Sequence, residues 1–241
     1  LWYIYIYRDI TFGNRYKICH NLKSLFNYFH IGIYLTISYQ ILTLIFNMDN
    51  QFVSWLFSAD TYGIYAFAYS LLNVVIMVLG SISFVILPHL KRNSNKLILN
   101  KYPIAISYLL LVIYFLLLGY FPMAFFIKMF LPEYIRSLIY LKILFPGVGI
   151  TCCINLIIFN YYSALNKFKF YSLLNLIILI LSFGLYSFAY ILFHNLISLS
   201  ITSLISLFIW YLASEHFLIK WYQVKWIKHF LYMIIMMVLF F

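Results

Sequence analysis

One charge-free stretch constrains the fold of this chain more than any other feature. Residues 62–87 contain no charged side chain, and the stretch ends at Pro88, before the basic pair Lys91 and Arg92. A helix rises about 1.5 Å per residue, so these residues can cross a hydrocarbon core about 30 Å thick. Similar apolar stretches recur along the sequence. They predict an all-α fold, a polytopic membrane helical bundle.

The recurring stretches predict about seven transmembrane helices joined by short loops. We expect these helices at residues 30–56, 62–88, 102–127, 137–165, 170–193, 196–218 and 227–241. The composition agrees, because only 9% of the residues are charged, whereas water-soluble domains carry about 25%.

This assignment divides the chain into three parts. Residues 1–29 comprise the end of a preceding span and a cytoplasmic connector with a short interfacial helix, residues 30–219 form a six-helix membrane lobe, and residues 220–241 form a basic loop and the start of a further transmembrane helix. The sequence opens on Leu1 and an apolar segment, without the basic start and small-residue cleavage site of a signal peptide. We therefore expect the chain to be a fragment of a longer protein.

The basic residues predict how the helices are oriented. Thirteen of the sixteen Lys and Arg residues lie in alternate loops, at 8–29, 89–101, 166–169 and 214–228. The opposite loops carry only Lys128 and Arg136, and Lys142 lies within a span. Because loops rich in Lys and Arg stay in the cytoplasm, the N-terminal connector is predicted to be cytoplasmic.

Small and polar residues line one face of the stretch that follows Asp60. Spacings of three and four residues place these side chains on one side of a helix. They are Gly63, Ala66, Ser70, Asn73, Met77 and Gly80. In a membrane, such a face either packs closely against another helix or lines a polar cavity. Both interpretations turn the face away from lipid and predict that Gly80→Leu impairs folding or transport.

The motifs in this region follow a recognisable order: a polar turn, YGIY, AYS, a small-residue centre, FVILP and a basic loop. This order resembles the multidrug/oligosaccharidyl-lipid/polysaccharide exporter superfamily, and within it the polysaccharide branch of O-antigen and capsule flippases. Asn47–Val53 resembles a helix end of that branch, although Asn50 stands where Arg is usual. Tyr140–Gly147 and Tyr161–Lys169 resemble its later half, so that the resemblance covers about residues 24–219.

The resemblance implies a function and a place for this chain within a larger transporter. The chain would be the C-terminal half, one lobe of a two-lobed exporter. The exporter would be a flippase that moves polyprenyl-diphosphate-linked oligosaccharide repeat units across the bacterial cytoplasmic (inner) membrane for O-antigen, capsule or exopolysaccharide assembly. Its partners would be lipid-linked oligosaccharide, membrane lipids, and polysaccharide polymerase and assembly proteins. No cofactor, metal or nucleic acid is implied.

Three charged residues are candidates for contact with substrate or ion. Asp49 is the acid nearest the interior of a span, and it is either an outer-interface carboxylate reached by water, or a cation or proton site, or a partner of Lys142. Lys142 either snorkels to the outer interface or faces a cavity together with Arg136, where the two cations hold a phosphate or an acidic sugar. The other substrate-binding candidates are Ser70, Asn73 and Asn155.

Further features of the spans predict packing rather than chemistry. Pro146, with glycines after it, predicts a kink in the fourth span, with either a structural or a gating role. Neutral polar residues are expected to form interhelical hydrogen bonds, a minority of them lining a hydrophilic groove. They are Asn155, Asn160, Ser172, Asn175, Ser182, Thr202 and Ser206. The six histidines lie at span ends without metal-ligand spacing, so interfacial anchoring is expected.

Other function classes fit the sequence less well. A membrane enzyme needs carboxylates or a basic cluster on a sizeable loop, whereas this chain has five acidic residues and short loops, so catalysis is not expected. A proton-pumping respiratory subunit would carry charges in the middle of its helices. Two alternatives stay open: a cation-coupled drug antiporter of the same superfamily, which would carry acids deep in its cavity, and an inactive truncated membrane fragment.

Overall fold

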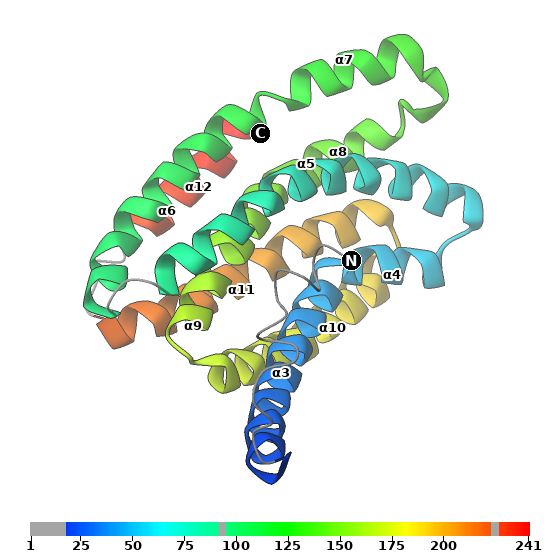
Figure 1. Ribbon diagram of the computed structural model, residues 1–241. Coiled ribbons are helices and arrows are strands. Elements are labelled where there is room, and N and C mark those ends of the chain that lie inside the picture. The colour runs from blue at the N-terminus through cyan, green and yellow to red at the C-terminus, as the bar shows by residue number, and fades with distance from the viewer. Residues whose placement is uncertain (1–17, 92–94, 223–226) are drawn as a thin grey trace, which may run out of the picture.

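The computed structural model describes residues 18–91, 95–222 and 227–241, and these residues form a bundle of helices (Figure 1). Its helices are α3 (Ile18–Phe46), α4 (Met48–Leu56), α5 (Ala59–Lys91), α6 (Asn95–Leu117), α7 (Tyr120–Phe130), η1 (Pro132–Tyr134), α8 (Ser137–Cys152), the π-helical η2 (Cys153–Ile158), α9 (Phe159–Ala164), α10 (Phe168–Phe193), α11 (Leu196–Tyr222) and α12 (Ile227–Phe240).

Several of these helices are long and apolar enough to cross a membrane. In the described parts of the chain there are five: Ala59–Gly80, Tyr102–Phe130, Ser137–Ala164, Phe168–Phe193 and Leu196–Lys220. Apolar segments at Thr36–Phe46 of α3 and Leu231–Phe240 of α12 lie at the places of the first and last expected spans. The predicted all-α membrane bundle is confirmed.

The helix made by α8, η2 and α9 lies at the centre of the bundle. Residues 144–152 are all buried, because α5 packs along one side of α8 and α11 along another. α10 packs against α3 and α11, and α12 packs against α6. Figure 1 shows α5 and α8 side by side, with α6 and α12 as a pair beyond them and α3 projecting away from the bundle.

The helix ends differ from the sequence-based expectations at three places. Residues 18–29 begin the long helix α3 rather than forming a separate interfacial helix, and residues 8–17 lie outside the described residues. The expected first span is interrupted by a turn at Asn47, which separates α3 from α4. The helix α5 continues through Pro88 to Lys91, where the sequence predicted an end.

The fourth span carries an irregularity beyond Pro146, and the kink predicted at Pro146 stays a prediction. α8 continues through Pro146 without interruption, whereas Cys153–Ile158 adopt π-helical hydrogen bonding. A π segment inserts an extra residue into a helix and shifts the faces on either side relative to each other. The fourth span therefore presents different neighbours before and after residues 153–158.

The small and polar stripe of α5 points away from the helices that the structure describes. Gly63, Ser70 and Asn73 are exposed, and Met77 has 78% of its surface exposed. A Cβ atom added at Gly63 or at Gly80 would meet nothing within 4 Å. The stripe therefore does not pack closely against another helix within the described residues, and both its packing against helices elsewhere and its cavity interpretation stay predictions.

The opposite face of α5 is the buried one. Tyr65, Ala68, Tyr69 and Leu72 are all buried there. These residues recur at spacings of three and four, as expected for one helix face. Aromatic side chains rather than small ones thus mediate the packing of α5 within the lobe, and the ring centroids of Tyr65 and Tyr140 of α8 are 5.7 Å apart.

Candidate functional site

A buried carboxylate lies where α4, α5 and α11 meet. Asp49, in the first turn of α4, has only 1% of its surface exposed. The Tyr65 hydroxyl donates to its Oδ2 at 3.0 Å, and the Ser203 hydroxyl donates to the same oxygen at 3.1 Å. The backbone N–H of Asn50 donates to Oδ1 at 2.8 Å. Both carboxylate oxygens therefore have hydrogen-bond partners from separate parts of the chain.

The turn at Asn47 explains why this carboxylate lies inside the bundle. A continuous helix would carry residue 49 onward along the axis of α3, whereas the turn starts a new helix whose first residues face inward. The Asn47 side chain donates to the Thr43 carbonyl at 2.8 Å, and the Tyr69 hydroxyl donates to the Phe46 carbonyl. The Tyr69 bond satisfies a carbonyl group at the end of α3, where intrahelical partners run out, whereas the Thr43 carbonyl also accepts from the Asn47 backbone N–H at 3.1 Å.

Polar side chains continue from this site along the interface of α10 and α11. The hydroxyls of Ser182 and Ser206 are 2.6 Å apart, and Trp210 Nε1 donates to Asn175 Oδ1 at 3.0 Å. Ser203, Ser206 and Trp210 follow one another at spacings of three and four, so they share a face of α11. The interhelical hydrogen bonds predicted for Asn175, Ser182 and Ser206 are confirmed.

Other neutral polar residues bond within their own helix instead. The Thr202 hydroxyl donates to the Ser198 carbonyl at 2.8 Å, and Asn160 Nδ2 donates to the Leu156 carbonyl at 2.8 Å. Hydroxyl and amide side chains in helices commonly bond to the carbonyl four residues earlier. The sequence predicted an interhelical hydrogen bond for Thr202, whereas its hydroxyl donates to the backbone of its own helix.

A second buried acid escaped the sequence analysis. Glu215 has 0% of its surface exposed, although the sequence analysis placed it in the loop 214–228. His229 Nδ1 of α12 lies 3.3 Å from Glu215 Oε1, and the Tyr102 hydroxyl of α6 donates to the same oxygen at 3.4 Å. The sequence did offer a signal. Ser203, Ser206 and Trp210 recur at spacings of three and four residues, Ser214 continues that spacing, and Glu215 is the next residue.

This second cluster joins three helices around Glu215. It corrects the expectation that Asp49 is the acid nearest a span interior, because α11 continues to Tyr222 and encloses Glu215. It also corrects the expectation that His229 anchors at an interface, since that side chain is buried. Acidic and basic groups inside a membrane bundle are costly and usually paired, as they are here.

The predicted substrate-binding residues lie apart from Asp49. Ser70 and Asn73 are exposed on α5, Arg136 is exposed in the turn before α8, and Lys142 is exposed on α8. Asn155 is half-buried in the π segment.

Asp49 is thus neither an interface carboxylate open to water nor a partner of Lys142. In the described residues, the close contact between an acidic and a basic side chain is that of Glu215 with His229. No described cationic side chain therefore neutralises Asp49. Nor do three His, Cys, Asp or Glu side chains gather as a metal site in that part of the chain.

Residues 1–94 match the sequence model of a family described as polysaccharide biosynthesis protein. The match agrees with the resemblance of the motifs over these residues, which make up less than half of the chain. Searches of curated proteins and of solved structures found no match. The matched residues of this polysaccharide biosynthesis family include Asp49 and the whole of α5, whereas Tyr140–Gly147 and Tyr161–Lys169 lie beyond the match.

The match and the helices together indicate the general class of this protein. The match over residues 1–94 supports a role in polysaccharide biosynthesis, and the described helices are long and apolar enough for a multi-pass membrane protein. Glu215 and the exposed polar stripe lie on helices long and apolar enough to cross a bilayer, whereas Asp49 lies on the short helix α4.

Proposed function

We propose that this chain forms one lobe of a flippase that moves polyprenyl-diphosphate-linked oligosaccharide across the bacterial cytoplasmic membrane for O-antigen, capsule or exopolysaccharide assembly. The observation that carries the proposal is the family match over residues 1–94 in a chain with several membrane-length helices. Membrane lipids surround the lobe, and the polymerase and assembly proteins receive the exported repeat units.

The exposed stripe of α5 supports a path for a sugar head group. Ser70 and Asn73 present polar groups on the surface of a long apolar helix. A polar face is unfavourable against lipid, so in a two-lobed exporter it is best covered by water and by the opposing lobe. Sugar hydroxyls then find hydrogen-bond partners, while the lipid tail stays in the bilayer.

Asp49 supports coupling of this movement to a cation or a proton. A buried carboxylate without a cationic partner is costly in an apolar interior. Binding a proton or a monovalent cation removes that cost. Its partners come from α4, α5 and α11, so neutralising Asp49 stabilises the contact of these helices, and the two states of Asp49 favour different packings of the lobe.

A cation-coupled drug antiporter of the same superfamily is the second candidate. The burial of two acids, Asp49 and Glu215, favours it more than the sequence did, because such transporters carry acids inside their bundles. The family match favours polysaccharide. The two candidates differ in cargo, and deletion of the gene distinguishes them.

Deleting the intact gene should abolish the surface polysaccharide and cause lipid-linked repeat units to accumulate on the cytoplasmic side. The measurements are gel analysis of surface polysaccharide and mass spectrometry of extracted lipid-linked oligosaccharide. Expression of the intact gene from a plasmid, which should restore both, is the control. Normal polysaccharide combined with altered drug sensitivity would replace the flippase by the antiporter.

A further inference from the structure

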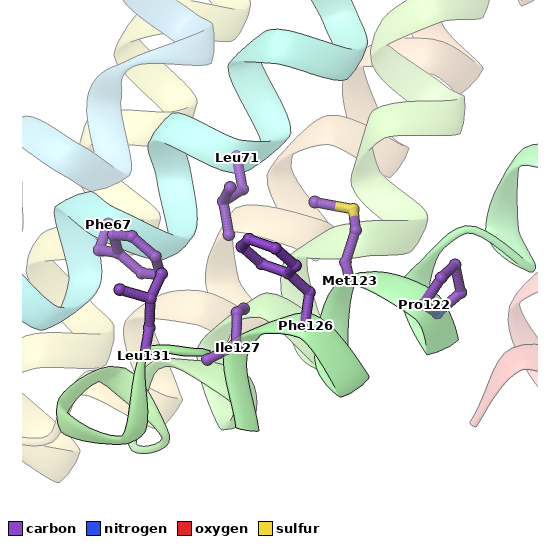
Figure 2. Close-up of a pocket in the computed structure, with 7 residues that line it drawn as sticks. All are labelled: Phe67, Leu71, Pro122, Met123, Phe126, Ile127 and Leu131. Atoms are coloured by element: carbon purple, nitrogen blue, oxygen red, sulfur yellow. The ribbon is translucent and has the colours of Figure 1, made fainter. Parts of the chain in front are cut away.

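A pocket between α5 and α7 is lined entirely by apolar side chains. Its volume is about 370 Å³. Figure 2 shows Phe67 and Leu71 of α5 facing Met123, Phe126 and Ile127 of α7, with one further apolar residue at each end. None of these side chains offers a strong hydrogen-bond donor or acceptor, so a sugar or phosphate gains nothing inside. A hydrocarbon chain fits this lining.

The pocket exists because the third span is divided. α6 ends at Leu117 and α7 begins at Tyr120. A Cβ atom at Gly119 would lie 2.9 Å from the Leu116 carbonyl oxygen, so only glycine fits this turn without a shift. Beyond the turn, α7 leans away from α5 and α8 (Figure 1), and the pocket opens toward the surroundings, where the Phe126 ring is 53% exposed.

Two exposed cations lie on the segment that runs from the end of α7 through η1 to the start of α8, beside the Leu131 end of the pocket. Lys128 follows Ile127 on α7, and Arg136 lies just beyond η1. The Tyr134 ring stacks on Phe67, with ring centroids 4.2 Å apart, and so holds the segment before Arg136 against the pocket wall. Lys128 and Arg136 are the two cations of the loops predicted to face away from the cytoplasm.

The exposed polar stripe lies directly beside the pocket on α5. Ser70 precedes the pocket residue Leu71 and lies on the adjoining face of α5, and Asn73 lies about one turn beyond Ser70 along the same stripe. Hydrocarbon-binding, cationic and hydrogen-bonding surfaces are therefore neighbours here. This order matches an amphiphile in which a phosphate group separates a hydrocarbon chain from a glycan.

We propose that the pocket between α5 and α7 holds a stretch of the isoprenoid chain of a polyprenyl-diphosphate lipid, with its phosphates at Lys128 and Arg136 and its glycan along Ser70 and Asn73. The proposal rests on the proposed function and deepens it by assigning each part of the substrate to a surface of this lobe. Apolar contact supplies affinity for the chain, and the cations select an anionic lipid over a neutral one.

The test is photolabelling of the intact protein in phosphatidylethanolamine vesicles with a benzophenone-bearing polyprenyl phosphate. We expect the label on peptides containing Met123 or Phe126. Met123→Trp fills the pocket and should lower labelling at least fivefold, whereas Phe125→Trp, on the exposed side of α7, should leave it unchanged. Arg136→Gln leaves the pocket intact and should weaken labelling by polyprenyl phosphate but not by a neutral benzophenone-bearing polyprenol.

Two results would overturn the proposal. One is labelling that Met123→Trp and Phe125→Trp affect equally. The other is competition by phosphatidylglycerol as effective as competition by unlabelled polyprenyl phosphate, which would make this an ordinary phospholipid site. The readout is binding, so it is independent of transport: labelling that persists in a protein without flippase activity would leave the pocket assigned and remove only the proposed function.

Discussion

Asp49→Asn should leave the protein folded and reduce export of the lipid-linked substrate at least tenfold. Asn keeps the size of the side chain and an oxygen that accepts from the Asn50 N–H, while the hydroxyls of Tyr65 and Ser203 can rotate to accept from its amide group. It cannot take up a proton or balance a cation. The measurement is the amount of surface polysaccharide made by a deletion strain that expresses the variant, together with the variant's membrane level.

Two further variants separate structure from coupling at this site. Asp49→Ala leaves the Tyr65 and Ser203 hydroxyls without their acceptor, at a cost of about 1–3 kcal/mol for each unsatisfied group, so its membrane level should also fall. Asp60→Asn removes an exposed acid at the start of α5 and should behave as wild type. Normal export by Asp49→Asn would contradict the ion-linked role of Asp49.

Gly149→Leu should prevent correct folding, whereas Gly80→Leu should leave the folding of this lobe intact. A Cβ atom at Gly149 would lie 2.6 Å from Ile113 Cγ2 and 3.2 Å from Met236 Cε. The Ile113 methyl is attached to a branched carbon and cannot move away freely, so α6 would have to shift. Overpacking of this kind costs about 1–3 kcal/mol even for small additions, and Leu adds more than one methylene.

The two glycines make a matched pair because the same substitution meets different surroundings. A Cβ at Gly80 meets nothing within 4 Å, so any defect of Gly80→Leu should appear in transport and not in membrane level. The difference is measured by heating detergent-purified protein and determining, by size-exclusion chromatography, how much protein still elutes as a monodisperse peak. Equal losses of folded protein for both variants would show that α8 is not the close-packed centre of the lobe.

The sequence predicted most helices because long apolar runs leave few alternatives in a membrane. The runs did not reveal where a helix is interrupted, since polar residues such as those at 49–51 also occur within a helix, and Gly119 stands in an apolar run. The sequence did not reveal the π segment at Cys153–Ile158, which carries no strong signal, and α8 continues through Pro146 because a proline's missing donor can be absorbed within a helix.

The functional residues show where sequence reasoning fails. Asp49 was found because an acid in an apolar run is conspicuous, but its burial depends on the turn at Asn47 and on partners from distant helices. Glu215 was assigned to a loop because nearby basic residues suggested an interface, whereas α11 continues past it to Tyr222. The face of α5 occupied by its small residues was predicted correctly from periodicity, but what that face contacts depends on the rest of the assembly.

Transbilayer movement of a labelled substrate tests the central claim most directly. The intact protein is reconstituted into vesicles that contain a polyprenyl-diphosphate oligosaccharide with a nitrobenzoxadiazole-labelled sugar, and dithionite quenches only the label exposed outside. The account predicts that the protected fraction disappears at least tenfold faster than in protein-free vesicles, that nitrobenzoxadiazole-phosphatidylethanolamine stays protected, and that Asp49→Asn abolishes the difference. Movement of the labelled oligosaccharide no faster than in protein-free vesicles would contradict it.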